Sequence, residues 1–302
     1  MNIQQKADKL IGIVTVLYNS DDVLPDFFES LARQTGVRFK LFVIDNSKSD
    51  SGSKISRELA DKYKIDSEII FNDENVGVAK GNNQGIILAQ KHECGYVLLA
   101  NNDTLFEQHD LLSSMVARLE KMNQPGAVTP KIYFYNQDRM IWFAGGKFRV
   151  SCASTPHFGY GKQDHGQFDH LKETEYAPTC FMMFTSSVFD RVGMMDERYF
   201  VYYDDSDFIW RMKSKNMPVG FISNQIVYHK VSHSTGGGKS VFSVFYLTRN
   251  RLMFARKNFS GLKKIVSISC FLGTHFIKIC FWQASLRASF FKGLKSGLCY
   301  EI

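Results

Sequence analysis

The sequence lacks the cysteine pairs and the leader segment that would mark several classes of protein. Its six cysteines are scattered and none forms a Cys-x-x-Cys pair, which argues against a zinc ribbon or a disulfide scaffold and predicts reduced thiols in a cytoplasm. The first ten residues, MNIQQKADKL, have no apolar signal-peptide core, so they do not favour export. With 44% hydrophobic and 22% charged residues among 302, the composition is that of a globular protein.

Glycine is absent from the turn after the first predicted strand. Residues 11–18, IGIVTVLY, are typical of a buried strand, and Asn19-Ser20-Asp21-Asp22 follows. A dinucleotide-binding dehydrogenase would have Gly-x-Gly-x-x-Gly here, and a nucleotidyltransferase a glycine-rich signature with Arg and Lys. A P-loop is missing as well. These absences argue against three classes of nucleotide-binding protein.

Acidic residues are scarce in the C-terminal part of the chain. Residues 249–302 contain ten Lys or Arg and one acid, although the whole chain has a net charge of only +7. Within 262–298 the basic residues alternate with large apolar ones, and Lys278 interrupts the one stretch that is nearly long enough to span a membrane. The pattern predicts a basic amphipathic helical segment at 259–302 that lies on an inner-membrane surface. Packing on the rest of the chain, or against a second copy in a homodimer, is the alternative.

Strand and helix patterns alternate over the first hundred residues. The predicted strands cover 11–18, 40–45, 68–71 and 96–101, and a helix covers 78–90. This alternation predicts an α/β fold with a mixed, mostly parallel sheet flanked by helices. Such sheets bind ligands at the carboxyl ends of their strands.

Polar residues stand at three of these strand ends, as Tyr18-Asn19, Asp45-Asn46 and Asn101-Asn102-Asp103. We therefore expect the ligand site at this edge of the sheet. The basic segment lies elsewhere in the sequence and no nucleic-acid-binding motif is present, so no nucleic-acid partner is expected.

The rest of the chain is less regular and rich in glycine and aromatic residues up to about residue 200. Further strands are predicted at 127–135, 142–150, 181–187 and 220–229, and helices at 204–215 and 241–259. Acids at the start and bases at the end of 204–215 both suit a helix dipole.

Seven motifs, in their order along the chain, resemble those of family 2 glycosyltransferases, and above all the bacterial rhamnosyltransferase- and galactofuranosyltransferase-like enzymes. They are YNS at 18–20, VIDNSKSDSG at 43–52, NVGVAKGNNQGI at 75–86, LLANNDT at 98–104, VGMMDERYFVYYDDSDFIWR at 192–211, VYHKVSHSTGG at 227–237 and YLTRNRLMFARKN at 246–258.

This resemblance implies a GT-A catalytic domain over residues 1–258, followed by the amphipathic segment at 259–302. It implies inverting transfer of a sugar from a UDP- or dTDP-sugar to a hydroxyl of a lipid-linked oligosaccharide, in O-antigen or capsule synthesis. The enzyme would work in the cytoplasm, peripherally on the inner membrane. A non-catalytic sugar- or nucleotide-binding scaffold of the same fold is the alternative.

A divalent cation is expected, because transfer leaves negative charge on the leaving diphosphate. The family's Asp-x-Asp motif reads Asn101-Asn102-Asp103 here, so Asp103 is the expected ligand and Asn101 a donor contact at most. By resemblance His229 completes the site, with His233 as the competitor. One carboxylate with phosphate oxygens suits Mg²⁺ or Mn²⁺, and an imidazole favours Mn²⁺ slightly.

A carboxylate is expected to accept the proton of the attacking hydroxyl. Asp204, Asp205 and Asp207 are the candidates, and the resemblance selects Asp205. Crowded acids would raise its pKa toward a useful value. Three acids in a first turn also have a simpler explanation, since they stabilise a helix N-terminus.

The remaining candidates surround the donor and the acceptor. The resemblance and the position at strand ends predict nucleotide contacts from Tyr18, Asn19, Asp45, Asn75, Gly77, Asn83 and Asn102. Possible donor or acceptor contacts are Gly81, Trp142, Gly145, Gly146, Asp204 and Arg249. Cys180 is interpreted as a small buried residue near the site, and Ser234–Gly238 as a lid over the diphosphate.

Overall fold

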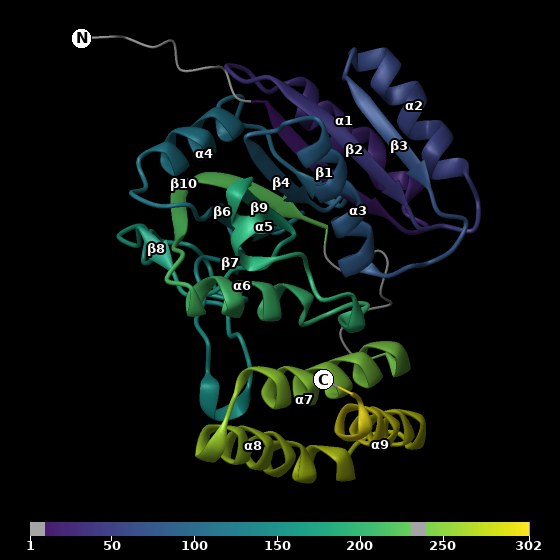
Figure 1. Ribbon diagram of the computed structural model, residues 1–302, viewed down its shortest axis with the longest axis vertical. Helices are drawn as coiled ribbons and strands as arrows, with labels where there is room; N and C mark the ends of the chain where they lie inside the picture. Colours follow the sequence, from purple (N-terminus) through teal and green to yellow (C-terminus); the bar gives the residue numbers. More distant parts are fainter. Residues whose placement is uncertain (1–9, 231–239, 302) are drawn as a thin grey trace.

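The computed structural model describes residues 10–230 and 240–301. Its centre is one mixed sheet of ten strands (Figure 1). The strand order is β3 (Ser67–Phe71), β2 (Phe39–Asp45), β1 (Ile11–Leu17), β4 (Tyr96–Ala100), β9 (Phe181–Thr185), β6 (Ala127–Phe134), β10 (Val219–His229) and β5 (Thr104–Leu105), with β7 (Ile141–Phe143) beside β6 and β8 (Glu173–Thr174) beside β10.

The first half of the sheet is parallel, as the alternating pattern predicted. β3, β2, β1 and β4 run parallel, and the register pairs Leu17 with Asp45. β9 is antiparallel to both β4 and β6, whereas β6 and β10 are parallel. The predicted α/β fold is confirmed, and the carboxyl ends of β1, β2 and β4 lie at one edge.

Helices cover the sheet and fix its strands. They are α1 (Leu24–Ala32), α2 (Ser51–Tyr63), α3 (Val78–Lys91), α4 (Leu111–Glu120), α5 (Ser187–Val192) and α6 (Asp204–Ser214). α3 packs on β1 and β2, and α4 on β6 and β10. A Cβ at Gly85 would lie 2.2 Å from Cγ1 of Val14, so a glycine is needed for α3 to approach β1 this closely.

The predicted strand at 142–150 is wrong beyond its first residues. β7 ends at Phe143, and Gly145 has a φ of +100°, which extended backbone does not adopt. The chain then forms a short 3₁₀ turn, η2, at Val150–Cys152. The apolar composition of this segment serves packing rather than sheet pairing.

The predicted amphipathic segment is a pair of helices rather than one. After α7 (Val241–Asn258), α8 covers Gly261–Cys280 and α9 covers Ala284–Cys299, and the three form a layer at one end of the molecule (Figure 1). α9 lies against α7, where Cβ atoms at Gly293 and Gly297 would come within 2.7 Å of α7 carbonyl oxygens. No helix in the described ranges is long and apolar enough to cross a membrane.

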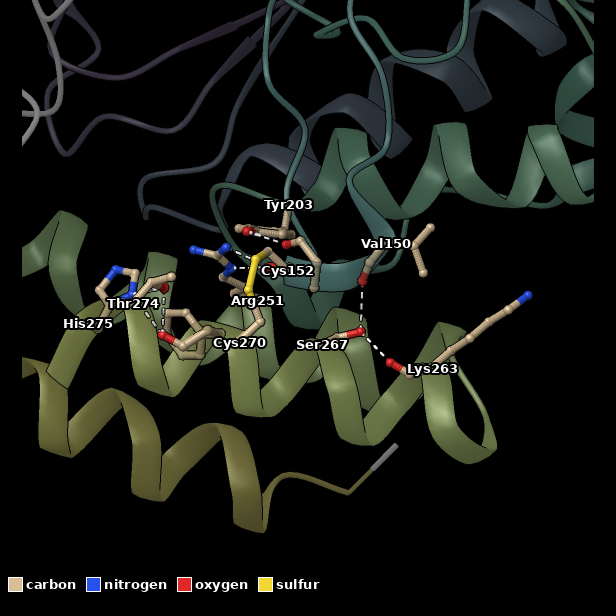
Figure 2. Close-up of a disulfide and its surroundings, with 11 residues drawn as sticks. Val150, Cys152, Tyr203, Arg251, Lys263, Ser267, Cys270, Thr274 and His275 are labelled. Atoms are coloured by element: carbon tan, nitrogen blue, oxygen red, sulfur yellow. Dashed lines mark hydrogen bonds between the residues drawn. A yellow bond between two sulfur atoms is a disulfide. The ribbon is translucent and has the colours of Figure 1, made fainter.

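A disulfide joins Cys152 of η2 to Cys270 of α8 (Figure 2). The prediction of reduced thiols is therefore wrong for these two residues. They are 118 residues apart, and only the docking of α8 on η2 brings their Cα atoms to 5.3 Å. Next to the disulfide, the Ser267 hydroxyl donates to the Val150 carbonyl at 2.8 Å (Figure 2).

Candidate active site

The polar residues that follow β1, β2 and β4 lie at one edge of the sheet, and hydrogen bonds join their loops. The Asn19 amide donates to the Ser47 hydroxyl at 3.0 Å, and the Asn102 side chain donates to the hydroxyl of Ser20. Asn19 has a φ of +48°, a conformation that Asn tolerates better than most residues. Tyr18 is 39% exposed, so its ring is open to a ligand.

Asp45 is fully buried at the end of β2, and protein groups bind both of its oxygens. Oδ1 accepts the Ser47 amide at 3.0 Å, and Oδ2 accepts the Ser53 hydroxyl at 2.7 Å. These bonds fix the start of α2 against the strand end. A nucleotide contact by Asp45 stays a prediction.

The segment before α3 is held by its own side chains and by Phe200. Asn75 accepts the Gly77 amide at 3.0 Å, and a Cβ at Gly77 would lie 2.7 Å from the Phe200 carbonyl oxygen. A Cβ at Gly81 would lie 3.0 Å from both Cγ atoms of Val16 on β1. Gly81 therefore serves helix–strand packing, and the donor contact there stays a prediction.

The Asn83 side chain is bound by the segment that follows α5, and its nucleotide contact stays a prediction. Its side-chain amide donates to the Met195 carbonyl and to Glu197, each at 2.9 Å, and its oxygen accepts the Met195 amide at 2.9 Å. The residue is 3% exposed. It joins α3 to the segment that leads to α6, a partnership across 112 residues.

Arg249 is likewise engaged within the protein. It is 8% exposed, and it donates to the Arg198 carbonyl at 2.8 Å and to Asn250 at 2.7 Å. The Tyr246 and Tyr300 rings lie 4.7 and 5.5 Å from its guanidinium carbon. These contacts account for the burial of the arginine, and its donor contact stays a prediction.

Asp103 and His229 come together at the end of β4. β5 follows Asp103 and pairs with β10, which places Thr104 opposite His229, and the Lys230 amide donates to the Asp103 carbonyl at 2.9 Å. Asp103 Oδ1 lies 3.2 Å from His229 Nε2. Both side chains are about nine-tenths buried, with 13% and 9% exposed.

This pair fits a divalent cation. Asp103 Oδ1 is buried without a hydrogen-bond donor, which is costly for a polar atom, and it lies 3.2 Å from His229 Nε2, so one ion can contact both atoms. No group of three or more His, Cys, Asp or Glu that could hold a metal occurs in residues 10–230 and 240–301. Two protein ligands with phosphate oxygens and water would match the way Mg²⁺ and Mn²⁺ are usually held. His233 and the predicted lid at 234–238 lie outside the described residues.

The acids of α6 differ in what surrounds them. Asp207 is fully buried and is bound by Arg211 and Lys257 at 2.9 and 2.8 Å. Asp204 is 5% exposed, and burial together with the charge of Asp205 raises its pKa to about 8. Asp204 is thus largely enclosed by the protein, and its contact with donor or acceptor stays a prediction.

Asp205 is half-buried, and its carboxylate accepts the Tyr176 hydroxyl at 2.6 Å. Burial raises the pKa of Asp205, while hydrogen bonds from Tyr176 and Ser206 oppose the rise. The direction agrees with the prediction, but burial rather than the crowding of acids is the main cause.

A wall of aromatic side chains connects the Asp103–His229 pair to Asp205. It consists of Trp142, His157 and Tyr176. The Trp142 ring centroid lies 4.6 Å from that of His229 and 4.9 Å from that of His157. Tyr176 stacks on His157 at 5.9 Å and donates to Asp205. Burial lowers the pKa of His157 to about 4, so its ring is neutral at physiological pH.

The sequence interpretation missed His157 and Tyr176. Both lie in the irregular segment between β7 and β9, where no periodicity or motif singles them out. Gly145 and Gly146 leave room for this wall and its neighbours, because Cβ atoms there would meet Phe158 at 3.0 Å and Tyr176 at 3.1 Å. Their donor or acceptor contacts stay predictions.

Cys180 lies between the two carboxylates that face the site. Burial raises the pKa of its thiol, and the charges of Asp103 and Asp205 raise it further. The Asn101 amide donates to the Cys180 carbonyl at 2.7 Å, which ties β9 to the end of β4. The thiol is buried, as predicted, and Asn101 itself is exposed.

Comparison with known proteins places the chain among sugar-transferring enzymes. The family model described as "Glycosyl transferase family 2" matches residues 12–193. The low-salt glycan biosynthesis hexosyltransferase Agl10 of Haloferax volcanii is 24% identical over 267 residues, which are 85% of this chain and 79% of that protein.

Two solved structures share the fold. The mannosyltransferase PcManGT from Pyrobaculum calidifontis, in complex with GDP-Man and Mn²⁺, is 12% identical with a TM-score of 0.61 and covers 96% of this chain and 87% of its own. Residues 1–349 of S. aureus TarS, in complex with UDP-GlcNAc, are 14% identical with a TM-score of 0.61 and cover 96% and 80%. At these identities the likeness concerns the fold, which is GT-A.

Proposed function

The chain belongs to glycosyl transferase family 2, and from this premise we propose that it transfers a hexosyl group from a nucleoside-diphosphate sugar to a hydroxyl of a lipid-linked glycan, with inversion. The observation that carries the proposal is the Asp103–His229 pair, with its unpartnered buried carboxylate oxygen, joined by the aromatic wall to Asp205. Relatives of the same fold bind GDP-Man or UDP-GlcNAc, so UDP, dTDP and GDP are all candidate donor nucleotides.

Each half of the site has a separate task. Asp103 and His229 would hold Mn²⁺ or Mg²⁺, which would supply electrostatic stabilisation of the leaving diphosphate. Asp205 accepts the proton of the acceptor hydroxyl as that oxygen attacks the anomeric carbon, and the diphosphate departs from the opposite face. Tyr18 and the strand-end loops bind the nucleotide, with Asn19, Asp45, Asn75, Gly77 and Asn102 around it.

Calorimetry with UDP, dTDP and GDP, each with and without Mn²⁺, tests the donor half. We expect Mn²⁺-dependent binding of one nucleotide, which Asp103→Asn removes and Asp205→Asn keeps. Binding that is independent of metal, or equal in Asp103→Asn, would contradict the cation site.

Turnover tests the chemistry and the scaffold alternative. Vesicles carrying polyprenyl-diphosphate-linked sugars serve as acceptors, and release of the free nucleotide is followed. Asp205→Asn should lower turnover at least 100-fold, about the smallest effect expected for a general base. Nucleotide binding without turnover on any acceptor tested would favour the non-catalytic scaffold.

A lipid-linked acceptor requires the enzyme to work at a membrane, and α8 carries a suitable surface. Leu262, Ile265, Val266, Leu272 and Phe276 recur at three- and four-residue spacing on α8, and each is 39–75% exposed. Such a stripe normally faces a protein core, yet here it faces outward.

The charge and the tip of this helix pair point to an anionic lipid surface. Phe281, between α8 and α9, is 85% exposed. No Asp or Glu occurs between Asp207 and Glu301, while the exposed lysines include Lys263, Lys292 and Lys295. Apolar side chains flanked by cations are typical of segments that lie in the interface of anionic membranes. We propose that the enzyme lies peripherally on such a membrane surface, in O-antigen, capsule or a related glycan synthesis. The cytoplasmic face of the inner membrane stays a prediction, because the Cys152–Cys270 disulfide is unusual for a reducing cytoplasm.

Co-sedimentation with vesicles of neutral or partly anionic lipid tests this surface. The double variant Phe276→Ser, Phe281→Ser should lose binding to anionic vesicles, whereas Ile87→Ser, which removes a 53% exposed side chain from α3, should keep it. Equal binding by all three proteins would contradict the lipid contact. A wild-type dimer that becomes a monomer in the double variant would show that a second copy covers the stripe instead.

A further inference from the structure

Both oxygens of Asp205 are held by groups of the protein. Oδ2 accepts the Tyr176 hydroxyl at 2.6 Å, and Oδ1 accepts the backbone amide and, at 3.1 Å, the hydroxyl of Ser206. Ser206 belongs to the same helix turn as Asp205, so its bonds are local. Tyr176 is the side chain that reaches the carboxylate from another part of the chain, 29 residues away.

Tyr176 is itself held rigidly. It is 3% exposed, and its ring packs between Phe148 at 5.6 Å and His157 at 5.9 Å. Its carbonyl accepts the Thr174 hydroxyl at 2.8 Å, and Gly146 leaves room for the ring, because a Cβ there would lie 3.1 Å from Cδ1 of Tyr176. The hydroxyl therefore has a fixed position from which to donate.

We propose that Tyr176 is a positioning residue for the proton-accepting carboxylate of Asp205. Its hydroxyl fixes the rotation of the carboxylate about χ2, so that the remaining lone pairs keep one direction relative to the attacking hydroxyl. The same hydrogen bond stabilises the charged carboxylate, which must be present before the acceptor hydroxyl can lose its proton. This inference rests on the proposed function, in which Asp205 is the base.

The groups around Asp205 make this hydrogen bond matter for its ionisation. Burial raises the pKa of Asp205, and the Tyr176 bond opposes that rise. Asp204 on the same helix adds a neighbouring acid, while Cys180 and Tyr203 face it from the adjoining segments as neutral groups, since burial raises the pKa of both. Removing the Tyr176 hydroxyl leaves the charged form of Asp205 less stabilised.

The test is Tyr176→Phe, which keeps the ring and removes the hydroxyl. A hydrogen bond to a charged group is worth enough to shift the acidic limb of the kcat/KM profile upward by about one pH unit. On that limb kcat/KM should therefore fall about tenfold, while the affinity for the nucleotide, measured by calorimetry, stays unchanged.

Tyr96→Phe is the matched control. Tyr96 is also buried, at 3% exposed, and also donates to a carboxylate, Glu120, but it lies at the opposite end of β4 from Asn101. It should not move the pH profile. The Asp205→Asn background supplies a second control, because Tyr176→Phe should have no further effect on turnover there.

Two results would overturn the inference. The acidic limb could stay in place in Tyr176→Phe, or the substitution could lower turnover further in the Asp205→Asn background. A failure of the proposed function looks different, because Asp205→Asn would then keep normal turnover whatever Tyr176 does.

Discussion

The variant Asn83→Ala distinguishes a nucleotide-binding role of Asn83 from a structural role. Replacing it with alanine removes three hydrogen bonds of 2.9 Å to Met195 and Glu197 and leaves the amide and carbonyl of Met195, which is 3% exposed, without partners. At about 1 kcal/mol for each bond, with an added penalty for unpaired buried groups, Asn83→Ala should lower the free energy of unfolding by about 2–4 kcal/mol. Urea unfolding measures the change, and calorimetry should find nucleotide affinity at low temperature unaltered.

The control is Gln90→Ala on the same helix, which removes an exposed hydrogen bond to Asp190. Its effect on unfolding should stay within about 0.5 kcal/mol, as for most surface substitutions. If Asn83→Ala left stability unchanged and weakened nucleotide binding tenfold, the structural role would be refuted and the motif-based prediction supported. The stabilisation lost in Asn83→Ala should also affect Asp205 indirectly, because Asn83 anchors the segment that leads into α6.

Two further predictions follow from contacts outside the site. Cys152→Ser should lower the free energy of unfolding by about 3–5 kcal/mol, because the disulfide to Cys270 closes a long loop. In the denatured wild type without reductant, free-thiol titration should not detect these two cysteines. Burial alone would raise the pKa of Asp196, but Arg198 and Lys257 outweigh burial and hold this pKa well below its usual range. The carboxylate therefore stabilises the fold at neutral pH, and this contribution is lost as the pH falls below about 4. The difference in unfolding free energy between wild type and Asp196→Asn should shrink over that range, and a constant difference would refute the reasoning.

The sequence predicted the sheet edge correctly because the signal there is local. β-branched runs define β1, β2 and β4, and parallel strands necessarily bring their carboxyl ends to one edge. Asp103 stands three residues after an apolar run and His229 ends one, but it was the resemblance to family 2 glycosyltransferases that named both as metal ligands. The distance of 3.2 Å between them depends on the pairing of β5 with β10. A strand as short as β5, with two residues, cannot be predicted from a sequence pattern.

The contacts that the sequence did not reveal share a different physical origin. The amide of Asn83 and the guanidinium of Arg249 donate to backbone carbonyls as readily as to phosphate oxygens, so residue type does not reveal the partner. Their partners lie 112 and 51 residues away, and the disulfide spans 118. Tyr176 was missed because it contacts Asp205 from 29 residues away, in a segment without periodicity.

These long-range contacts also make the C-terminal helices a support for the segment that carries Asp205. Asn250 of α7 donates to the carbonyls of Tyr199, Val201 and Tyr202, and Asn258 donates to Asp207 at 2.9 Å, so α7 holds both sides of the turn that presents Asp205. α8 and α9 in turn cover α7, with Phe271 and Phe290 packed near Leu252. A helix pair that meets the membrane through one face and braces α7 through the other would set the height and orientation of Asp205 above the lipid surface. On this view the tail is not merely an anchor, because the position of the base relative to a membrane-bound acceptor depends on it.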